Sequence, residues 1–267
     1  MRFGFVARVT LALALLVLGI FLLKWFYFET KSPVGMPVVQ KQEIKKTQKL
    51  PDFSKIIDVR ERKKAFFDFI RPGVLHANRQ ISLKRQFLLD IKTSLVTDIS
   101  WQDLTSQQRE RIDAIAQHYK VKSTVDSMAA LEGLLAKVDI IPKELVMVQA
   151  ANESGWGTSR FARLGLNFFG QWCFSKGCGL VPSSRNDDAN HEVRVFDSVD
   201  ASIASYLNNL NTHPAYAHLR EIRLELRQNN LPVKAEFLAP GLLNYSERQQ
   251  DYVVELLQML RHNKAYL

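Results

Sequence analysis

Glu153 is the residue of this sequence whose setting best suits acid–base chemistry. It follows Gln149 by four positions and Val146 by seven, so a helix would place it on the face that buries Val146. Gly155 and Gly157 predict that this helix ends just beyond Glu153. Burial and the negative end of a helix dipole both raise the pKa of a carboxyl group. A carboxyl group that stays protonated near neutral pH can act as a general acid toward a glycosidic oxygen.

A structural role for Glu153 is the alternative that periodicity alone leaves open. The carboxylate can pair with Arg160 or Arg163, or reach solvent at the end of the helix. Structural ion pairs also perturb the pKa of an acid. The motifs around Glu153 therefore have to decide between the two interpretations.

The elements that would position Glu153 are mostly helices. From Ile56 onward, apolar residues recur near a spacing of 3.6, and Pro72-Gly73 predicts an end or a kink in the first helix. Further helices are predicted after Thr105 or Ser106, after Asp126 or Ser127, from Pro142, after a cap at Ser198, from Pro214, and from Ser246 with Gln249 completing a capping box.

The helical period lapses between Gly165 and Asp197, where glycines mix with aromatic and polar residues. Residues 191–197 alternate apolar and polar side chains, which predicts a strand that belongs to a small β-hairpin. The predicted fold class is therefore mainly α with one small β excursion.

The N-terminal residues predict a membrane anchor. Residues 9–23 carry no charge, and the apolar span through Phe28 reaches the roughly 20 residues that a bilayer requires. Arg2 and Arg8 favour an internal N-terminus, although lysines on the other flank weaken that bias. A cleaved signal peptide is the alternative, but no small-x-small site follows the apolar run. We predict an anchor over 1–28, a basic linker over 29–52, a helical region over 53–125 and a second domain over 126–267.

The composition fits a globular protein with an anionic partner. The chain has 267 residues, 46% of them hydrophobic and 24% charged, and a formal net charge of +9. Such a charge suits nucleic acid, phospholipid or an acidic wall polymer. The basic residues gather in the linker and the first helix without an aromatic-interleaved groove motif, so we predict no nucleic-acid partner.

Two motifs resemble those of the glucosaminidase domains grouped as glycoside hydrolase family 73. Glu-Ser-Gly-Trp-Gly stands at 153–157, and Asn-Phe-Phe-Gly stands at 167–170. Val-Arg-Val-Phe at 193–196 and Tyr245 resemble later parts of the same domain, so the resemblance covers about residues 130 to 265. The whole chain is similar to the bacterial Bax family, which is unrelated to the animal apoptosis protein of that name.

The resemblance implies a lysozyme-like, two-lobed α fold that cuts the β-1,4 bond between N-acetylglucosamine and N-acetylmuramic acid. It implies Glu153 as the catalytic acid and Tyr245 as a second residue of the cleft. The motif residues that it implies for substrate binding are Trp156, Asn167, Phe169 and Gly170. Core packing is the alternative for the two aromatic residues among them. The implied partner is the peptidoglycan glycan strand, with no cofactor.

The second catalytic carboxylate does not align with the family pattern. Glu192 can position water as a base, yet the start of a strand equally permits an exposed, solvated side chain. Asp187 and Asp188 suit turn formation. The acetamido group of the sugar is a further candidate, since some glycosidases use it.

Cys173 and Cys178 bracket a short loop, and their pairing depends on the compartment. With the catalytic domain in the periplasm and the anchor in the inner membrane, we predict a disulfide. A reduced pair of small core residues is the alternative. His191, His213 and His218 show no ligand pattern with acids, so we predict no metal.

Two other functions fit the same motifs. A lytic transglycosylase shares the lysozyme-like fold and leaves 1,6-anhydro ends, whereas a glucosaminidase leaves reducing N-acetylglucosamine. A non-catalytic peptidoglycan-binding membrane protein would keep the cleft and lose the reaction.

Overall fold

Helices make up most of the structure, as the periodicity of the apolar residues predicts. The computed structural model describes residues 50–122, 124–182 and 191–267, and Leu50–Leu267 form one compact unit. The predicted anchor at 1–28, most of the predicted linker, and Asp187 and Asp188 lie outside the described residues. Among the described helices, none combines the length and the apolar character needed to span a bilayer.

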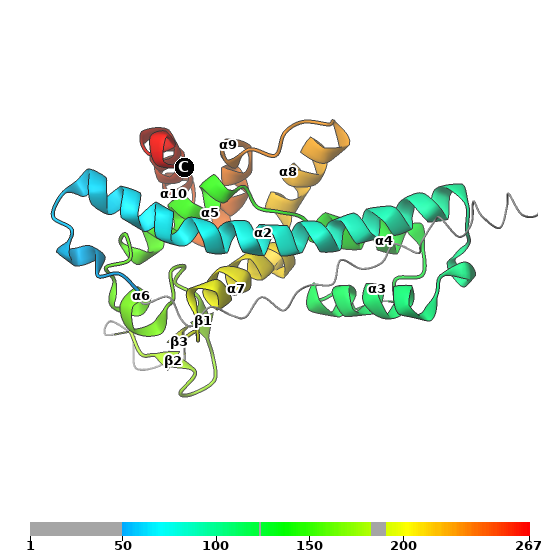
Figure 1. The fold of residues 1–267 in the computed structure, drawn as a ribbon, viewed down its shortest axis with the longest axis horizontal. Helices are drawn as coiled ribbons and strands as arrows, with labels where there is room; N and C mark the ends of the chain where they lie inside the picture. The colour runs from blue at the N-terminus through cyan, green and yellow to red at the C-terminus, as the bar shows by residue number, and fades with distance from the viewer. Residues whose placement is uncertain (1–49, 123, 183–190) are drawn as a thin grey trace, which may run out of the picture. The chain divides into compact units, whose positions relative to one another are not determined.

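A single long helix organises the unit. Helix α2 (Val59–Thr97) spans 39 residues, or about 58 Å at 1.5 Å per residue. It starts at Asp58, whose side chain accepts a hydrogen bond from the backbone N–H of Glu61, and it runs across the view in Figure 1. The helix continues through Pro72, so the predicted helix end at Pro72-Gly73 is wrong.

Tertiary packing explains why α2 continues past Pro72. Buried side chains lie on both sides of the proline, at Ile70 and Val74. A β-carbon at Gly73 would come within 2.6 Å of Asp200 Oδ1 and 2.8 Å of Ile203 Cδ1. Gly73 therefore lets helix α7 (Val199–Thr212) approach α2 closely, and this packing offsets the missing hydrogen bond of the proline.

Two hydrophobic clusters hold the unit together, and α2 contributes to both. The C-terminal part of α2 packs with α3 (Ser106–His118) and α4 (Met128–Lys137), as Figure 1 shows. The N-terminal part of α2 shares the larger cluster with α5 (Lys143–Ser154), α7 and the helices that follow. Residues from the region 53–125 thus complete the core around Glu153. The cap predicted at Ser198 is confirmed, and of the paired alternatives the caps are Thr105 and Ser127.

The remaining elements are short. They are the 3-10 helices η1 (Phe53–Lys55), η2 (Trp101–Asp103), η3 (Pro214–Tyr216), η4 (Ala239–Tyr245) and η5 (Lys264–Tyr266), and the α-helices α6 (Arg160–Gly165), α8 (Ala217–Gln228), α9 (Ala235–Leu238) and α10 (Gln250–His262).

Helix α10 begins later than the sequence predicts. Gln249 precedes it with no side-chain cap, so the predicted capping box at Ser246 is wrong. The backbone N–H of Gln249 instead donates to the Ser246 carbonyl oxygen at 3.0 Å, which closes a turn after η4. This turn sets the direction in which α10 enters the core, with Tyr252 buried in its first turn.

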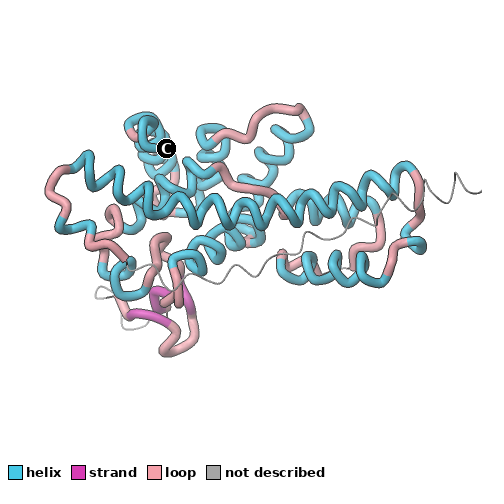
Figure 2. The backbone as a smooth tube through the Cα atoms, viewed as in Figure 1, coloured by secondary structure: helices cyan, strands magenta, loops and turns pink. Residues whose placement is uncertain are grey.

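A small antiparallel sheet lies beside α6, drawn in magenta in Figure 2. Its strands are β1 (Trp172–Cys173), β2 (Gly179–Leu180) and β3 (Glu192–Arg194), in the order β1-β3-β2. The predicted strand at 191–197 is thus real but shorter, because the Phe196 N–H bonds to the Gly165 carbonyl oxygen of α6. The predicted two-stranded hairpin is one part of a three-stranded sheet.

Candidate functional site

Glu153 lies in the last turn of α5, which ends at Ser154 as predicted. Gly155 follows in the left-handed conformation with φ of +55° and closes the helix. Along α5, Gln149 and Ala150 are fully buried, whereas Glu153 is half-buried. The side chain therefore stands where a core-facing helix stripe meets the surface.

A chain of hydrogen bonds from three elements ends on Glu153. The Tyr206 hydroxyl of α7 donates to Gln149 Oε1, and Gln149 Nε2 donates to the Tyr252 hydroxyl oxygen at 2.9 Å. The Tyr252 hydroxyl of α10 then donates to Glu153 Oε1 at 2.7 Å. Gln149 and Tyr252 each accept one hydrogen bond and donate the next in this chain, the Tyr206–Gln149–Tyr252 chain. The chain fixes the orientation of the carboxyl group through one of its oxygens.

Burial dominates the electrostatics of Glu153. Loss of solvent raises the pKa of this carboxyl group above its ordinary value, and this effect exceeds the opposing ones. The Tyr252 hydrogen bond and the positive charge of Arg248 favour the ionised form and lower the pKa, while Glu255 raises it. The group is therefore biased toward holding a proton and still has a donor ready to stabilise the carboxylate.

The second oxygen of Glu153 lies beside a glycine. A β-carbon at Gly170 would stand 3.8 Å from Glu153 Oε2, and Gly170 itself is exposed with φ of +63°. This backbone conformation favours glycine, which leaves the approach to Oε2 free of a side chain at that point. The Asn-Phe-Phe-Gly motif therefore ends at the carboxyl group.

Tyr245 holds the same loop from the other side. Its hydroxyl donates to the Phe169 carbonyl oxygen at 2.7 Å, and its ring stacks on Tyr252 with centroids 5.6 Å apart. Burial raises the pKa of Tyr245 well above its ordinary value, so the hydroxyl stays protonated. Tyr245 thus belongs to the cluster around Glu153, with its hydrogen bond directed to the loop backbone.

Asn167 and Phe169 are buried and shape the loop from within. Asn167 Nδ2 donates to the carbonyl oxygens of Gln171 and Arg194, and its Oδ1 accepts from the N–H groups of Phe169 and Gln171. The Phe169 ring stacks on Tyr206 at 4.0 Å. Their bonds and contacts are with the protein itself, and Gly170 is the residue of this motif that faces Glu153.

Trp156 packs against helix α2. Its ring lies 5.8 Å from Phe66 and 5.2 Å from Phe67, both edge to face, and Lys63 Nζ stands 5.2 Å from its centroid. The residue is half-buried and has φ of +59°. These contacts give Trp156 a packing role, whereas its predicted contact with sugar stays a prediction.

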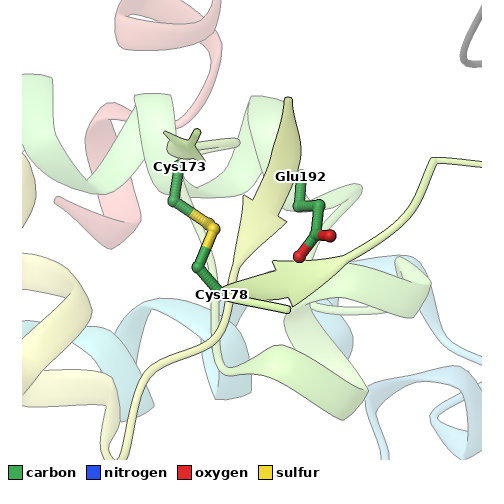
Figure 3. Close-up of side chains that lie close together, drawn as sticks. All are labelled: Cys173, Cys178 and Glu192. Carbon is green, nitrogen blue, oxygen red and sulfur yellow. A yellow bond between two sulfur atoms is a disulfide. The ribbon is translucent and has the colours of Figure 1, made fainter. Parts of the chain in front are cut away.

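Glu192 lies in the small sheet and bonds to the loop between the cysteines. Its Oε1 accepts from the Gly177 N–H at 3.0 Å, and its Oε2 accepts from the Gly179 N–H at 2.8 Å. The side chain is buried, and Figure 3 shows it beside the disulfide. These bonds support a positioning role for Glu192, and its role as a base stays a prediction.

Cys173 and Cys178 form a disulfide in the structure. Their sulfur atoms and a Glu192 carboxylate oxygen lie within 4.8 Å of one another, a spacing that a metal ion could use (Figure 3). Thiolates are the metal-binding form of cysteine, and both sulfurs are instead bonded to each other. We therefore assign this cluster to the covalent closure of the loop.

Sequence reasoning missed Tyr252, Tyr206 and the role of Gln149. Gln149 stands one turn before Glu153 on the same helix face, a signal that was available. Tyr252 is 99 positions from Glu153 along the chain, and only the packing of α10 on α5 brings the two together.

Comparisons with known proteins identify the family of the chain. A family described as mannosyl-glycoprotein endo-beta-N-acetylglucosaminidase matches residues 128–265 of the chain. The chain is 34% identical over 223 residues to Protein bax of Escherichia coli (strain K12), which covers 83% of this chain and 77% of that protein. No solved structure matches the chain.

Proposed function

The chain belongs to the bacterial Bax family and carries its glucosaminidase domain, and we propose that it hydrolyses the β-1,4 bond between N-acetylglucosamine and N-acetylmuramic acid in peptidoglycan. The proposal places the bond beside Glu153, in a lysozyme-like, two-lobed domain. It takes the glycan strand as substrate.

The hydrogen bond from Tyr252 to Glu153 is the observation that carries the proposal. It orients a carboxyl group whose pKa is raised by burial, and it leaves Oε2 next to the exposed Gly170. A general acid benefits from a raised pKa, which lets it hold its proton to higher pH, and from an oxygen that no side chain at position 170 blocks.

The proposed reaction starts with proton transfer. The Glu153 carboxyl group gives its proton to the glycosidic oxygen as the bond to the sugar carbon breaks, and the leaving sugar departs as an alcohol. The Tyr252 hydroxyl then stabilises the new carboxylate through the bond it already makes. Water supplies the oxygen of the new reducing end and the proton that restores Glu153.

The proposed mechanism has two candidates for the group that assists from the other face of the sugar. Glu192 is one candidate, but both of its oxygens accept backbone N–H groups. Assistance by the acetamido group of the substrate is the other candidate. The acidic residues Asp187 and Asp188 lie outside the described residues.

We place the domain in the periplasm, tethered to the inner membrane by residues 1–28. The disulfide between Cys173 and Cys178 supports a compartment outside the cytoplasm, where such bonds persist. The apolar run in residues 9–23 supports the tether.

Mass spectrometry of purified wall digested by the full-length chain tests the proposal. We expect fragments with reducing N-acetylglucosamine ends. We expect Glu153→Gln to release them about 10²- to 10⁴-fold more slowly, which is the usual contribution of a general acid. Ends of the 1,6-anhydro type would indicate a lytic transglycosylase. Binding of the wall with no release of fragments would indicate a non-catalytic binding protein.

A further inference from the structure

Trp172 is an exposed aromatic residue that none of the roles above explains. It lies on β1, and 57% of its surface is accessible, although burying an aromatic ring normally stabilises a fold. It stands two residues after Gly170, the glycine beside Glu153 Oε2. Two residues of chain span at most about 7 Å, so the backbone of Trp172 lies within that distance of Gly170.

The backbone on both sides holds Trp172 in a fixed position. Gln171 bonds through its side chain to the Ser202 carbonyl oxygen at 2.9 Å and to the Ser205 hydroxyl at 2.8 Å, and its backbone bonds to Asn167. Trp172 pairs with Val193 across the sheet. The next residue is Cys173, which the disulfide anchors. An exposed side chain on so constrained a backbone is preorganised for binding.

The ring of Trp172 is also held in orientation. It stacks on His191 with centroids 4.2 Å apart and an angle of 19° between the planes. The stack covers one face of the indole, so the exposed surface belongs to its other face and its edges. The result is a flat apolar surface at a defined angle next to the site.

We infer that the exposed face of Trp172 binds one N-acetylated sugar ring of the glycan strand, in the subsite next to the bond that Glu153 cleaves. A β-linked pyranose presents a face of C–H groups, and a neutral apolar face packs well on an indole. A polymer cut within its length must occupy positions beyond the scissile bond, and the place of Trp172 two residues after Gly170 suits such a neighbouring position. This inference rests on the proposed function.

Sedimentation with purified insoluble peptidoglycan tests the inference in the full-length Glu153→Gln background, which prevents digestion. Adding Trp172→Ala is expected to weaken binding about tenfold, the factor that about 1.4 kcal/mol of lost stacking represents. Trp172→Tyr is expected to keep the affinity within about threefold, because it retains a flat ring. A soluble oligomer of β-1,4-N-acetylglucosamine is expected to compete with the wall for the binding that Trp172 provides.

Phe237→Ala is the matched control. Phe237 is an aromatic residue on α9 with 47% of its surface accessible. Figure 1 shows α9 and the sheet on opposite sides of α2. It is expected to bind as the background does. In the active chain, Trp172→Ala is expected to raise KM more than it lowers kcat, which a purely structural residue would not do.

The outcomes separate the inference from the proposed function. The inference is overturned if the Glu153→Gln chain binds equally well with and without Trp172→Ala. It is also overturned if Trp172→Tyr loses as much binding as Trp172→Ala, because that result would indicate a structural role. An active wild-type chain with either of those results leaves the proposed function standing. Conversely, loss of binding by Trp172→Ala, with a wild-type chain that releases no sugar ends, supports sugar binding by Trp172 and defeats the proposed activity.

Discussion

The carboxyl group of Glu153 is shaped by two opposing influences from its neighbours. Burial favours the protonated form, whereas the Tyr252 hydroxyl at 2.7 Å favours the ionised form. A catalytic acid has to give up its proton and later recover it, so both influences suit the proposed reaction. The balance between them sets the pH at which Glu153 gives up its proton.

Tyr252→Phe is expected to shift the alkaline limb of activity to higher pH. The substitution removes the hydrogen bond that stabilises the carboxylate, so the pKa of Glu153 rises further and the group stays protonated at higher pH. The maximal rate is expected to fall, because the orienting bond is lost as well. The pH profile of kcat/KM, measured by release of reducing ends, checks this expectation.

Tyr245→Phe is the control for this shift. Its hydroxyl bonds to the Phe169 carbonyl oxygen, so its removal leaves the bond between Tyr252 and Glu153 in place. The alkaline limb should stay where the wild type has it. An unchanged limb in Tyr252→Phe would contradict the role that we give to Tyr252.

Sequence reasoning reached Glu153 but only part of its surroundings. The acid could be predicted because helix spacing, the glycine stop and the motif residues all lie within a few positions of it. Tyr206 and Tyr252 lie on other helices, and no local pattern specifies which hydroxyl will meet Gln149 or Glu153. From the sequence, Glu192 suits either a base that positions water or an exposed, solvated side chain. Only the fold reveals its backbone partners.

The elements follow the same division between local and long-range signals. The caps are local signals: the sequence predicts Ser198 directly and narrows the other two to neighbouring pairs, of which the structure has Thr105 and Ser127. The continuation of α2 through Pro72 depends on α7, and β1 is a strand because Trp172 pairs with Val193 of β3. Tertiary packing overrides local propensity at these two places.

Glu192→Gln separates a positioning role from a catalytic one. A glutamine side chain offers one acceptor oxygen, so one of the two bonds to Gly177 and Gly179 is lost, at a cost of about 1 to 3 kcal/mol in unfolding free energy. Fragment release is expected to fall less than about tenfold. Urea unfolding and digestion rates measure the two effects.

Glu153→Gln provides the comparison for Glu192→Gln. If Glu192→Gln lowers the rate of fragment release by about 10² or more, as Glu153→Gln is expected to do, and leaves the stability unchanged, Glu192 is the catalytic base. That result would contradict the positioning role and exclude assistance by the acetamido group alone.

The disulfide is expected to contribute to the stability of the sheet. Replacing Cys173 and Cys178 together by serine removes a closed loop from the unfolded chain, which lowers the unfolding free energy by about 2 kcal/mol. Denaturant unfolding with and without a reductant measures the effect. The reductant should destabilise the wild type and leave the serine variant unchanged; equal sensitivity of both would show that the effect does not come from this bond.

At the scale of the whole unit, one buried acid joins the two hydrophobic clusters. Asp139 lies after α4 and is 2% exposed. Arg227 of α8 binds both of its oxygens, at 2.9 and 3.0 Å, and Arg85 of α2 stands 3.5 Å away. The smaller cluster of α2, α3 and α4 is thereby tied to the helices that surround Glu153.

Arg223 completes this junction and is the residue whose loss should cost the most. It is 1% exposed and donates to the carbonyl oxygens of Ala136, Asp139 and Ile140 at 3.0 to 3.1 Å, which include groups that the end of α4 leaves without helical partners. Arg223→Ala removes the charged donor from the Ala136 and Ile140 carbonyl oxygens, while the Asp139 carbonyl oxygen keeps its bond from Asn211 Nδ2. We expect a loss of about 3 to 5 kcal/mol in urea unfolding. The Arg227 side chain is 38% exposed, and Arg85 and Arg223 still face Asp139 when it is removed. Arg227→Ala should therefore lower the unfolding free energy by less. Equal losses in the two variants would mean that the charge of Asp139, rather than the end of α4, sets the strength of the junction.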